Sequence, residues 1–82
     1  LAVILDLHRS DRGNLAEATP APQRMADANS VTFWSEVAAA YKDEGRVIFE
    51  LYNEPHDITW SVWRDGGASG DGFTAVGMQD LY

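Results

Sequence analysis

The side chains best suited to chemistry follow two apolar segments of the chain. His8 comes directly after the apolar run Leu1–Leu7, and Glu54 lies two residues beyond the mostly apolar run Val47–Tyr52. A carboxyl group can act as a general acid or base, and an imidazole can bind a substrate or transfer a proton. Pro55 follows Glu54, and proline at this point ends a strand and restricts the turn. The position of Glu54 therefore fits a catalytic role and a structural role equally well.

Two buried strands and a crossover helix would position these side chains. Apolar runs of this kind are typical of parallel strands that are buried on both faces. We expect strands over residues 1–9 and 46–53, with a helix over 30–44 between them. A strand, a helix and a second strand form a βαβ unit with parallel strands. The ends of both strands, and with them His8 and Glu54, would then meet at one edge of the sheet.

The predicted helix is amphipathic. Its apolar side chains recur at helical spacing and form one face, which consists of Trp34, Val37, Ala38 and Tyr41. Ser30 fits the N-cap, and Gly45 fits the position just past the last turn. We therefore expect Trp34 in the core.

The rest of the chain is predicted as loops and a further helix. Residues 10–29 and 56–72 have the composition of loops, and residues 73–82 resemble the first turns of a helix. Two parallel strands cannot satisfy their own edges or cover both faces. We therefore predict an α/β protein in which residues 1–82 form a βαβα slice of a (β/α)8 TIM barrel or a doubly wound sheet, a fragment of one catalytic domain.

Both strands carry carboxylates on one face. Alternation along the strands assigns that face to Ile4, Asp6 and His8 on the first strand and to Ile48, Glu50, Tyr52 and Glu54 on the second. The opposite faces are apolar, as expected where a helix packs. A polar inner face fits an α/β barrel with its chemistry at the carboxyl ends of the strands. We expect Asp6 and Glu50 to be structural, hydrogen-bonded to Arg or His neighbours.

Composition excludes several classes of function. Thirteen acidic residues against six basic ones give a net charge of −7, which argues against nucleic acid or an anionic membrane as partner. The chain has no cysteine, so thiolate metal sites and disulfides are excluded. No apolar run approaches the roughly 20 residues of a membrane span. The spacing of His8 and His56 matches no metal motif, and we expect neither a metal nor a cofactor.

A family resemblance adds to this interpretation. Val47–His56 resembles the catalytic fourth strand of glycoside hydrolase family 5, the cellulase family, and Val3–His8 resembles its third strand. The third helix of that family and the entry to its fourth strand are matched by Phe33-Trp34, Tyr41-Lys42 and Arg46. The resemblance implies a (β/α)8 barrel, of which this chain is about a third.

The resemblance also implies roles for individual residues. Glu54 would be the general acid/base of a retaining hydrolase that cleaves β-1,4-glucan by double displacement. Asn53 would hydrogen-bond the sugar 2-hydroxyl, and His8 would line the same subsite. The nucleophile of the family is a Glu on the seventh strand, outside this chain. Glu50 cannot replace it, because four strand residues place it about 13 Å below Glu54, whereas retaining enzymes need about 5 Å.

Two tryptophans follow the predicted acid/base. Trp60 and Trp63 fit a platform on which sugar rings stack, but the role favoured for either residue is to pin the loop to the barrel. The same frame serves β-mannanases and other β-glucanases, and a non-catalytic carbohydrate-binding relative or an unrelated α/β protein are further alternatives. We expect the partner to be a β-glucan, the full-length protein to be monomeric, and its location to be extracellular, as its polymeric substrate is.

Overall fold

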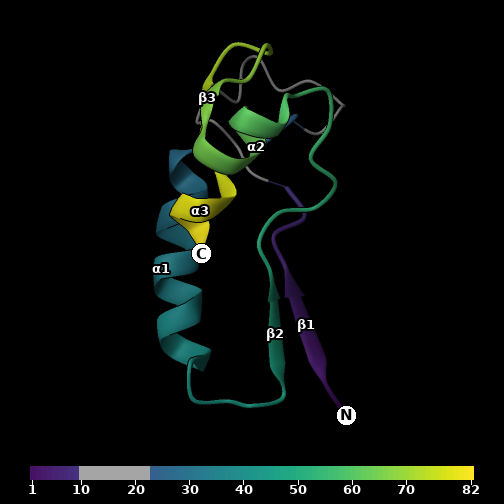
Figure 1. The fold of residues 1–82 in the computed structure, drawn as a ribbon. Coiled ribbons are helices and arrows are strands. Elements are labelled where there is room, and N and C mark those ends of the chain that lie inside the picture. Colours follow the sequence, from purple (N-terminus) through teal and green to yellow (C-terminus); the bar gives the residue numbers. More distant parts are fainter. Residues whose placement is uncertain (10–22) are drawn as a thin grey trace.

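The computed structural model describes residues 1–9 and 23–82. Its first half is a βαβ unit made of β1 (Val3–Asp6), α1 (Ala28–Tyr41) and β2 (Val47–Glu50). The two strands are parallel, in a register that runs from Val3 opposite Val47 to Asp6 opposite Glu50. They lie side by side, with α1 to one side of the pair (Figure 1). The predicted parallel pairing is therefore confirmed, although both strands are shorter than expected.

Helix α1 begins earlier than predicted, because Asp27 and not Ser30 is its N-cap. The Ser30 N–H donates to Asp27 Oδ1 at 3.1 Å, and the Asp27 N–H donates to Ser30 Oγ at 3.0 Å. This reciprocal pair is a capping box, in which each side chain satisfies a backbone N–H of the other residue. The helix ends at Tyr41, with Lys42 as its C-cap, so Gly45 lies in the connection to β2.

The second half contains more regular structure than predicted. It consists of α2 (Trp60–Asp65), β3 (Gly67–Ala68), β4 (Thr74–Ala75) and α3 (Met78–Leu81). Strands β3 and β4 form a small antiparallel hairpin. The prediction of a loop over 56–72 was therefore wrong where α2 and β3 lie. The predicted helix over 73–82 was wrong at its start, because β4 occupies that place.

Two glycines explain how these short elements fit together. Gly66 ends α2 with a φ of +86°, and a Cβ at this position would lie 2.7 Å from the Ala75 carbonyl oxygen. Gly77 precedes α3, and a Cβ there would overlap the backbone of Arg64 and Asp65. Gly77 is therefore the N-cap of a helix and does not lie inside one. It allows the start of α3 to approach the end of α2 closely.

The core lies between the β1–β2 pair and the helices. Its buried members are Leu7, Ala26, Trp34, Tyr52 and Leu81. Trp34 is only 3% exposed, as predicted, and its indole N–H donates to the Leu51 carbonyl oxygen at 2.8 Å. Its ring packs edge-to-face on Phe49 at 5.4 Å between centroids. Tyr41, predicted on the same face of α1, is instead 48% exposed, because it lies in the last turn, beyond the packed part of the helix.

The other face of the strand pair carries exposed apolar side chains. Ile4 is 60% exposed and Ile48 is 54% exposed. A parallel α/β unit is thus confirmed, whereas its place as a slice of a (β/α)8 barrel stays a prediction. Within residues 1–9 and 23–82, no helix has the length and apolar character that crossing a membrane requires.

Candidate active site

The carboxyl ends of β1 and β2 are joined beyond the strands themselves. The Leu7 N–H donates to the Glu50 carbonyl at 3.2 Å, and the Asn53 N–H donates to the Leu7 carbonyl at 3.0 Å. Both strands point toward the end of the molecule where α2 and β3 lie (Figure 1). This pairing brings the backbone of Asn53 beside Leu7, next to His8. Two of the predicted site residues are therefore neighbours through the parallel topology.

Glu54, the predicted acid/base, follows this junction in an uncommon backbone conformation. Its φ is +49°, and among the described residues that are not glycine only Asp57 shares a positive φ. A side chain disfavours this left-handed region, so residues other than glycine seldom adopt it. Those that do cluster at functional sites. The Glu54 side chain is exposed. A carboxyl group there is open to solvent and to a substrate.

The predicted alternation of side chains fails between Glu50 and Glu54. Tyr52 was expected on the face of Ile48 and Glu50, both exposed, but it is 4% exposed and belongs to the core with Trp34. The reason is that β2 ends at Glu50, so the two-residue period no longer applies beyond it. The Tyr52 hydroxyl donates to the Gln23 carbonyl at 2.9 Å.

The buried phenol of Tyr52 is also electrostatically unusual. Burial raises its pKa to about 12, and the negative charges of Asp27 and Asp71 act in the same direction. The phenolate is disfavoured in low-dielectric surroundings near like charges. Tyr52 is therefore a neutral anchor just before the site, and not a proton donor near neutral pH.

His8 pairs with a carboxylate on its own strand. Its Nδ1 lies 2.8 Å from Asp6 Oδ2, with the His8 side chain 69% exposed and that of Asp6 26% exposed. Asp6 was predicted to be held by an Arg or His neighbour, and the geometry supplies that histidine. The exposure of the His8 side chain leaves its imidazole accessible to a ligand.

A clamp holds the segment that follows Glu54. The Arg24 backbone donates to Asp71 Oδ2 at 3.0 Å and accepts from the His56 N–H at 3.0 Å, while its guanidinium donates to the Asp57 carbonyl at 3.4 Å. His56 Nδ1 lies 2.9 Å from Asp57 Oδ2, and this hydrogen bond and the imidazole charge lower the pKa of Asp57. Sequence analysis missed the clamp, because Arg24 lies in a segment predicted as loop and its partners are more than thirty positions away.

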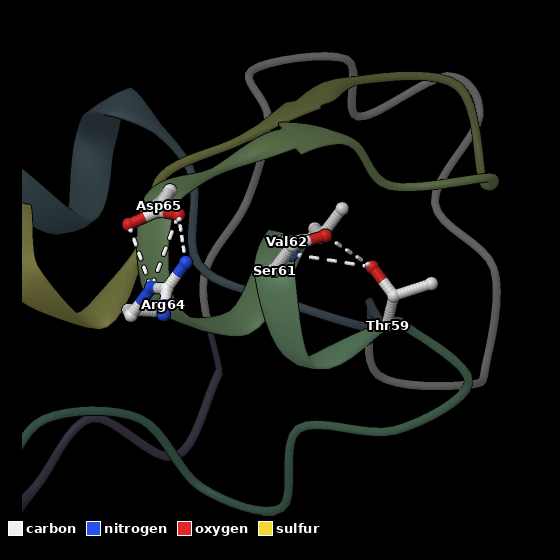
Figure 2. A network of polar contacts seen from close by, with 5 residues as sticks. All are labelled: Thr59, Ser61, Val62, Arg64 and Asp65. Atoms are coloured by element: carbon white, nitrogen blue, oxygen red, sulfur yellow. Dashed lines mark hydrogen bonds and ion pairs between the residues drawn. The ribbon is translucent and has the colours of Figure 1, made fainter.

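Trp60 and Trp63 lie on α2 and not in a loop. The Thr59 hydroxyl caps this helix by accepting from the Val62 N–H at 3.2 Å, and an Arg64–Asp65 ion pair of 2.8 Å lies at its end (Figure 2). The two indoles pack edge-to-face, 5.8 Å apart at 83°. Trp60 is 83% exposed and Trp63 is 37% exposed. Trp60 therefore has the larger open surface of the two.

The described part of the chain contains no group of three or more His, Asp or Glu side chains that could hold a metal ion. The prediction that no metal or cofactor is needed stays a prediction.

Comparison with protein families identifies the class of the chain. The family model of the cellulases, glycosyl hydrolase family 5, matches residues 1–71. The chain therefore belongs to this family, whose fold is the (β/α)8 barrel. No solved structure was found to match it.

The curated relatives are fungal enzymes named endoglucanases. The "Manganese dependent endoglucanase Eg5A" of Phanerodontia chrysosporium is 40% identical over 65 residues, which is 74% of this chain and 16% of the relative. "Endoglucanase 1" of Robillarda sp. is 36% identical over 70 residues, 84% of this chain and 17% of the relative. "Endoglucanase EG-II" of Hypocrea jecorina is 32% identical over 63 residues, 73% of this chain and 14% of the relative. The chain thus spans about a sixth of the length of such relatives.

Proposed function

We propose that residues 1–82 are part of the catalytic barrel of a retaining glycoside hydrolase that cleaves β-1,4-glucan chains internally. Membership in the cellulase family and the names of the relatives support this proposal. The observation that carries it is the position of Glu54, which has an exposed side chain and a left-handed backbone at the carboxyl end of a parallel strand pair. Active sites of α/β barrels lie at that end of the strands.

In the proposed mechanism Glu54 acts twice. A glutamate from another strand of the barrel attacks the anomeric carbon as the glycosidic bond breaks, and Glu54 gives its proton to the leaving oxygen. A covalent glycosyl-enzyme results. Glu54 then removes a proton from water, which attacks the anomeric carbon and releases the nucleophile as a free carboxylate. Each step conserves protons, and Glu54 returns to its starting state.

Asn53 and His8 bind the sugar at the cleavage point in this proposal. The hydrogen bond from the Asn53 N–H to the Leu7 carbonyl holds the two residues at adjacent strand ends. An amide and an imidazole can both hydrogen-bond sugar hydroxyls. Both residues directly follow the strand pair, so the sheet limits the movement of their backbone, which favours catalysis.

Trp60 is the better of the two tryptophans for a sugar platform. Its indole is 83% exposed, whereas Trp63 is 37% exposed and packs on Trp60 edge-to-face. Aromatic faces suit the apolar side of a sugar ring. Trp63 supports Trp60 in this arrangement, so both residues contribute to the platform.

The substrate class determines the remaining parts of the proposal. Polymeric β-glucan occurs outside cells, so an extracellular location follows, and a monomer is sufficient for a barrel that contains its whole site. A β-mannanase or another β-glucanase would use the same acid/base. Release of reducing sugar from glucan, but not from mannan, by the full-length protein separates these possibilities.

Replacement of Glu54 tests the proposal. In the full-length protein, we expect Glu54→Gln to lower kcat on unactivated glucan by about 10²–10⁴-fold, because the general acid is lost. A nitrophenyl glycoside, whose leaving group needs no proton, should lose far less in its glycosylation step. Both substrates should bind as they do to the unaltered protein.

Glu50→Gln is the matched control, because it neutralises a carboxylate on the same strand at a position that the proposal gives no part in the reaction. Its activity should stay within about twofold of the unaltered protein. Equal losses on both substrates with Glu54→Gln would contradict the acid/base role. A full-length protein that binds glucan without hydrolysing it would favour a non-catalytic carbohydrate-binding relative.

A further inference from the structure

We propose that Asp6 is a positioning residue that fixes the tautomer of His8, so that His8 Nε2 accepts a hydrogen bond from a sugar hydroxyl. The inference deepens the proposed function and rests on it, because the sugar is the ligand of the site containing His8. The distance of 2.8 Å between Asp6 Oδ2 and His8 Nδ1 is the observation from which it starts.

The pair joins Asp6, whose backbone is held by the sheet, to the exposed imidazole of His8. Asp6 is the last residue of β1 and stands in register with Glu50 of β2, and the next residue, Leu7, also donates to the Glu50 carbonyl. The sheet therefore holds the Asp6 backbone in place. His8 lies just beyond β1, and its side chain is 69% exposed against 26% for Asp6. A hydrogen bond to the fixed carboxylate removes much of the rotational freedom of the exposed ring.

The chemistry of the two groups determines which nitrogen carries the proton. An ionised carboxylate only accepts hydrogen bonds, so Nδ1 of His8 must be the donor. In the neutral imidazole, Nε2 then has a lone pair and no proton. Sugar hydroxyls both donate and accept, and so cannot select a tautomer themselves. Asp6 makes that selection in advance, as carboxylates do for histidines that bind metals.

The second oxygen of Asp6 argues against a purely structural role. Asp6 Oδ1 is buried and has no hydrogen-bond partner among the residues that the structure describes. A buried, unsatisfied polar atom lowers stability. Apart from its contact with His8, Asp6 therefore adds little to the stability of this part of the fold. A function exerted through His8 accounts for its presence better than stability does.

Nitrogen NMR of the histidine ring tests the tautomer directly. In the full-length protein at a pH where His8 is neutral, the ¹⁵N shifts should show a protonated Nδ1 and an unprotonated Nε2. Asp6→Asn keeps the size of the side chain but can donate from its amide, and it should move the shifts toward the other tautomer or toward a mixture. Glu50→Gln removes a charge from the opposite strand and should leave the shifts unchanged.

A double-mutant cycle tests whether Asp6 acts through His8. We expect Asp6→Asn to lower kcat/KM on glucan about tenfold, a typical effect for a carboxylate that orients a histidine. On a His8→Ala background the same change should have less than a twofold effect, because there is no ring left to orient. Circular dichroism should show that every variant is folded.

Two results would overturn the inference: unchanged His8 shifts in Asp6→Asn, or losses that simply multiply in the double variant. The second would mean that Asp6 acts independently of His8. Failure of the proposed function is a separate outcome, because a full-length protein without glucan hydrolysis would still show the tautomer of His8. In that case the NMR result alone decides whether Asp6 positions the ring.

Discussion

The two faces of the β1–β2 pair differ in how they are covered. On one face, Leu7 and Phe49 pack in or against the core that contains Trp34 of α1, itself 3% exposed. On the other face, Ile4 and Ile48 are 60% and 54% exposed. Large apolar side chains in the middle of neighbouring strands form a contiguous patch, and such patches mark surfaces that other protein covers.

The uncovered face also carries the carboxylates of the strands. Asp6 and Glu50 stand opposite each other at the ends of β1 and β2. Isoleucines deeper in the strands and polar groups nearer their carboxyl ends are the arrangement expected inside an α/β barrel, with a packed interior and an active site at its upper rim. The covered face packs on α1, and we propose that further strands of the barrel enclose the open face, which carries Ile4 and Ile48.

The isolated chain offers the strongest test of this comparison. Expressed alone, residues 1–82 should show no glycosidase activity and no cooperative thermal melt. We expect the nucleophile on another strand of the barrel, and the open face and strand edges leave too little buried surface for a chain of this size. Reducing-sugar release from carboxymethylcellulose and a melt followed by circular dichroism are the measurements. A cooperative melt with turnover would mean that a carboxylate of this chain, such as Asp57, Asp65 or Asp71, is the nucleophile.

Ile48→Ala in the full-length protein sharpens the comparison. If the open face is the barrel interior, Ile48 is buried there, and its truncation should lower the free energy of unfolding by about 2–5 kcal/mol. If the face remains in solvent, the loss should stay below about 0.5 kcal/mol. Urea unfolding at equilibrium distinguishes the two.

Trp34→Ala on the covered face is the control for that measurement. Trp34 is buried in the structure as it stands, so its truncation should cost about 3–5 kcal/mol whatever covers the other face. A small effect at Ile48 combined with a large one at Trp34 would contradict the barrel interpretation of the open face.

The parts of the fold that were predictable have a periodic or topological signal. The apolar runs of β1 and β2 and the helical spacing in α1 were sufficient to predict a parallel βαβ unit. The same topology predicted that the carboxyl ends of the two strands meet at one edge, and the Asn53 N–H indeed donates to the Leu7 carbonyl there. The start of α1 was predicted wrongly, because Asp27 and Ser30 are both capping residues three positions apart and the sequence favoured Ser30.

The parts that were missed lack such a signal. Strands of two residues, as in β3 and β4, are too short for alternation to be visible. Gly77 packs closely on the backbone of Arg64, which lies thirteen positions earlier in the sequence. Sequence alone cannot reveal this contact. The face of Tyr52 was wrong because the alternation rule was extended past Glu50, where β2 ends.

Tyr52 provides the smallest predicted effect at neutral pH. In the full-length protein, Tyr52→Phe removes the hydrogen bond of 2.9 Å to the Gln23 carbonyl, and should lower the free energy of unfolding by about 1 kcal/mol at pH 7. Tyr41→Phe is the matched control, because Tyr41 is 48% exposed and its replacement should change stability little. Urea unfolding of the three proteins gives the comparison.

The effect of Tyr52 should reverse in alkali. Its pKa is raised in the folded protein from 10.0 to about 12, so between these values the folded state holds a proton that the unfolded state has lost. Stability therefore falls as pH rises through this window, by about 2–3 kcal/mol at its upper end. Tyr52→Phe lacks this group, so its disadvantage at pH 7 should shrink above pH 10 and become an advantage near pH 12. A stability difference that is constant with pH would mean that the Tyr52 phenol ionises as easily in the folded protein as in the unfolded chain. The surroundings of Tyr52 would then be more open to solvent than the rest of the core.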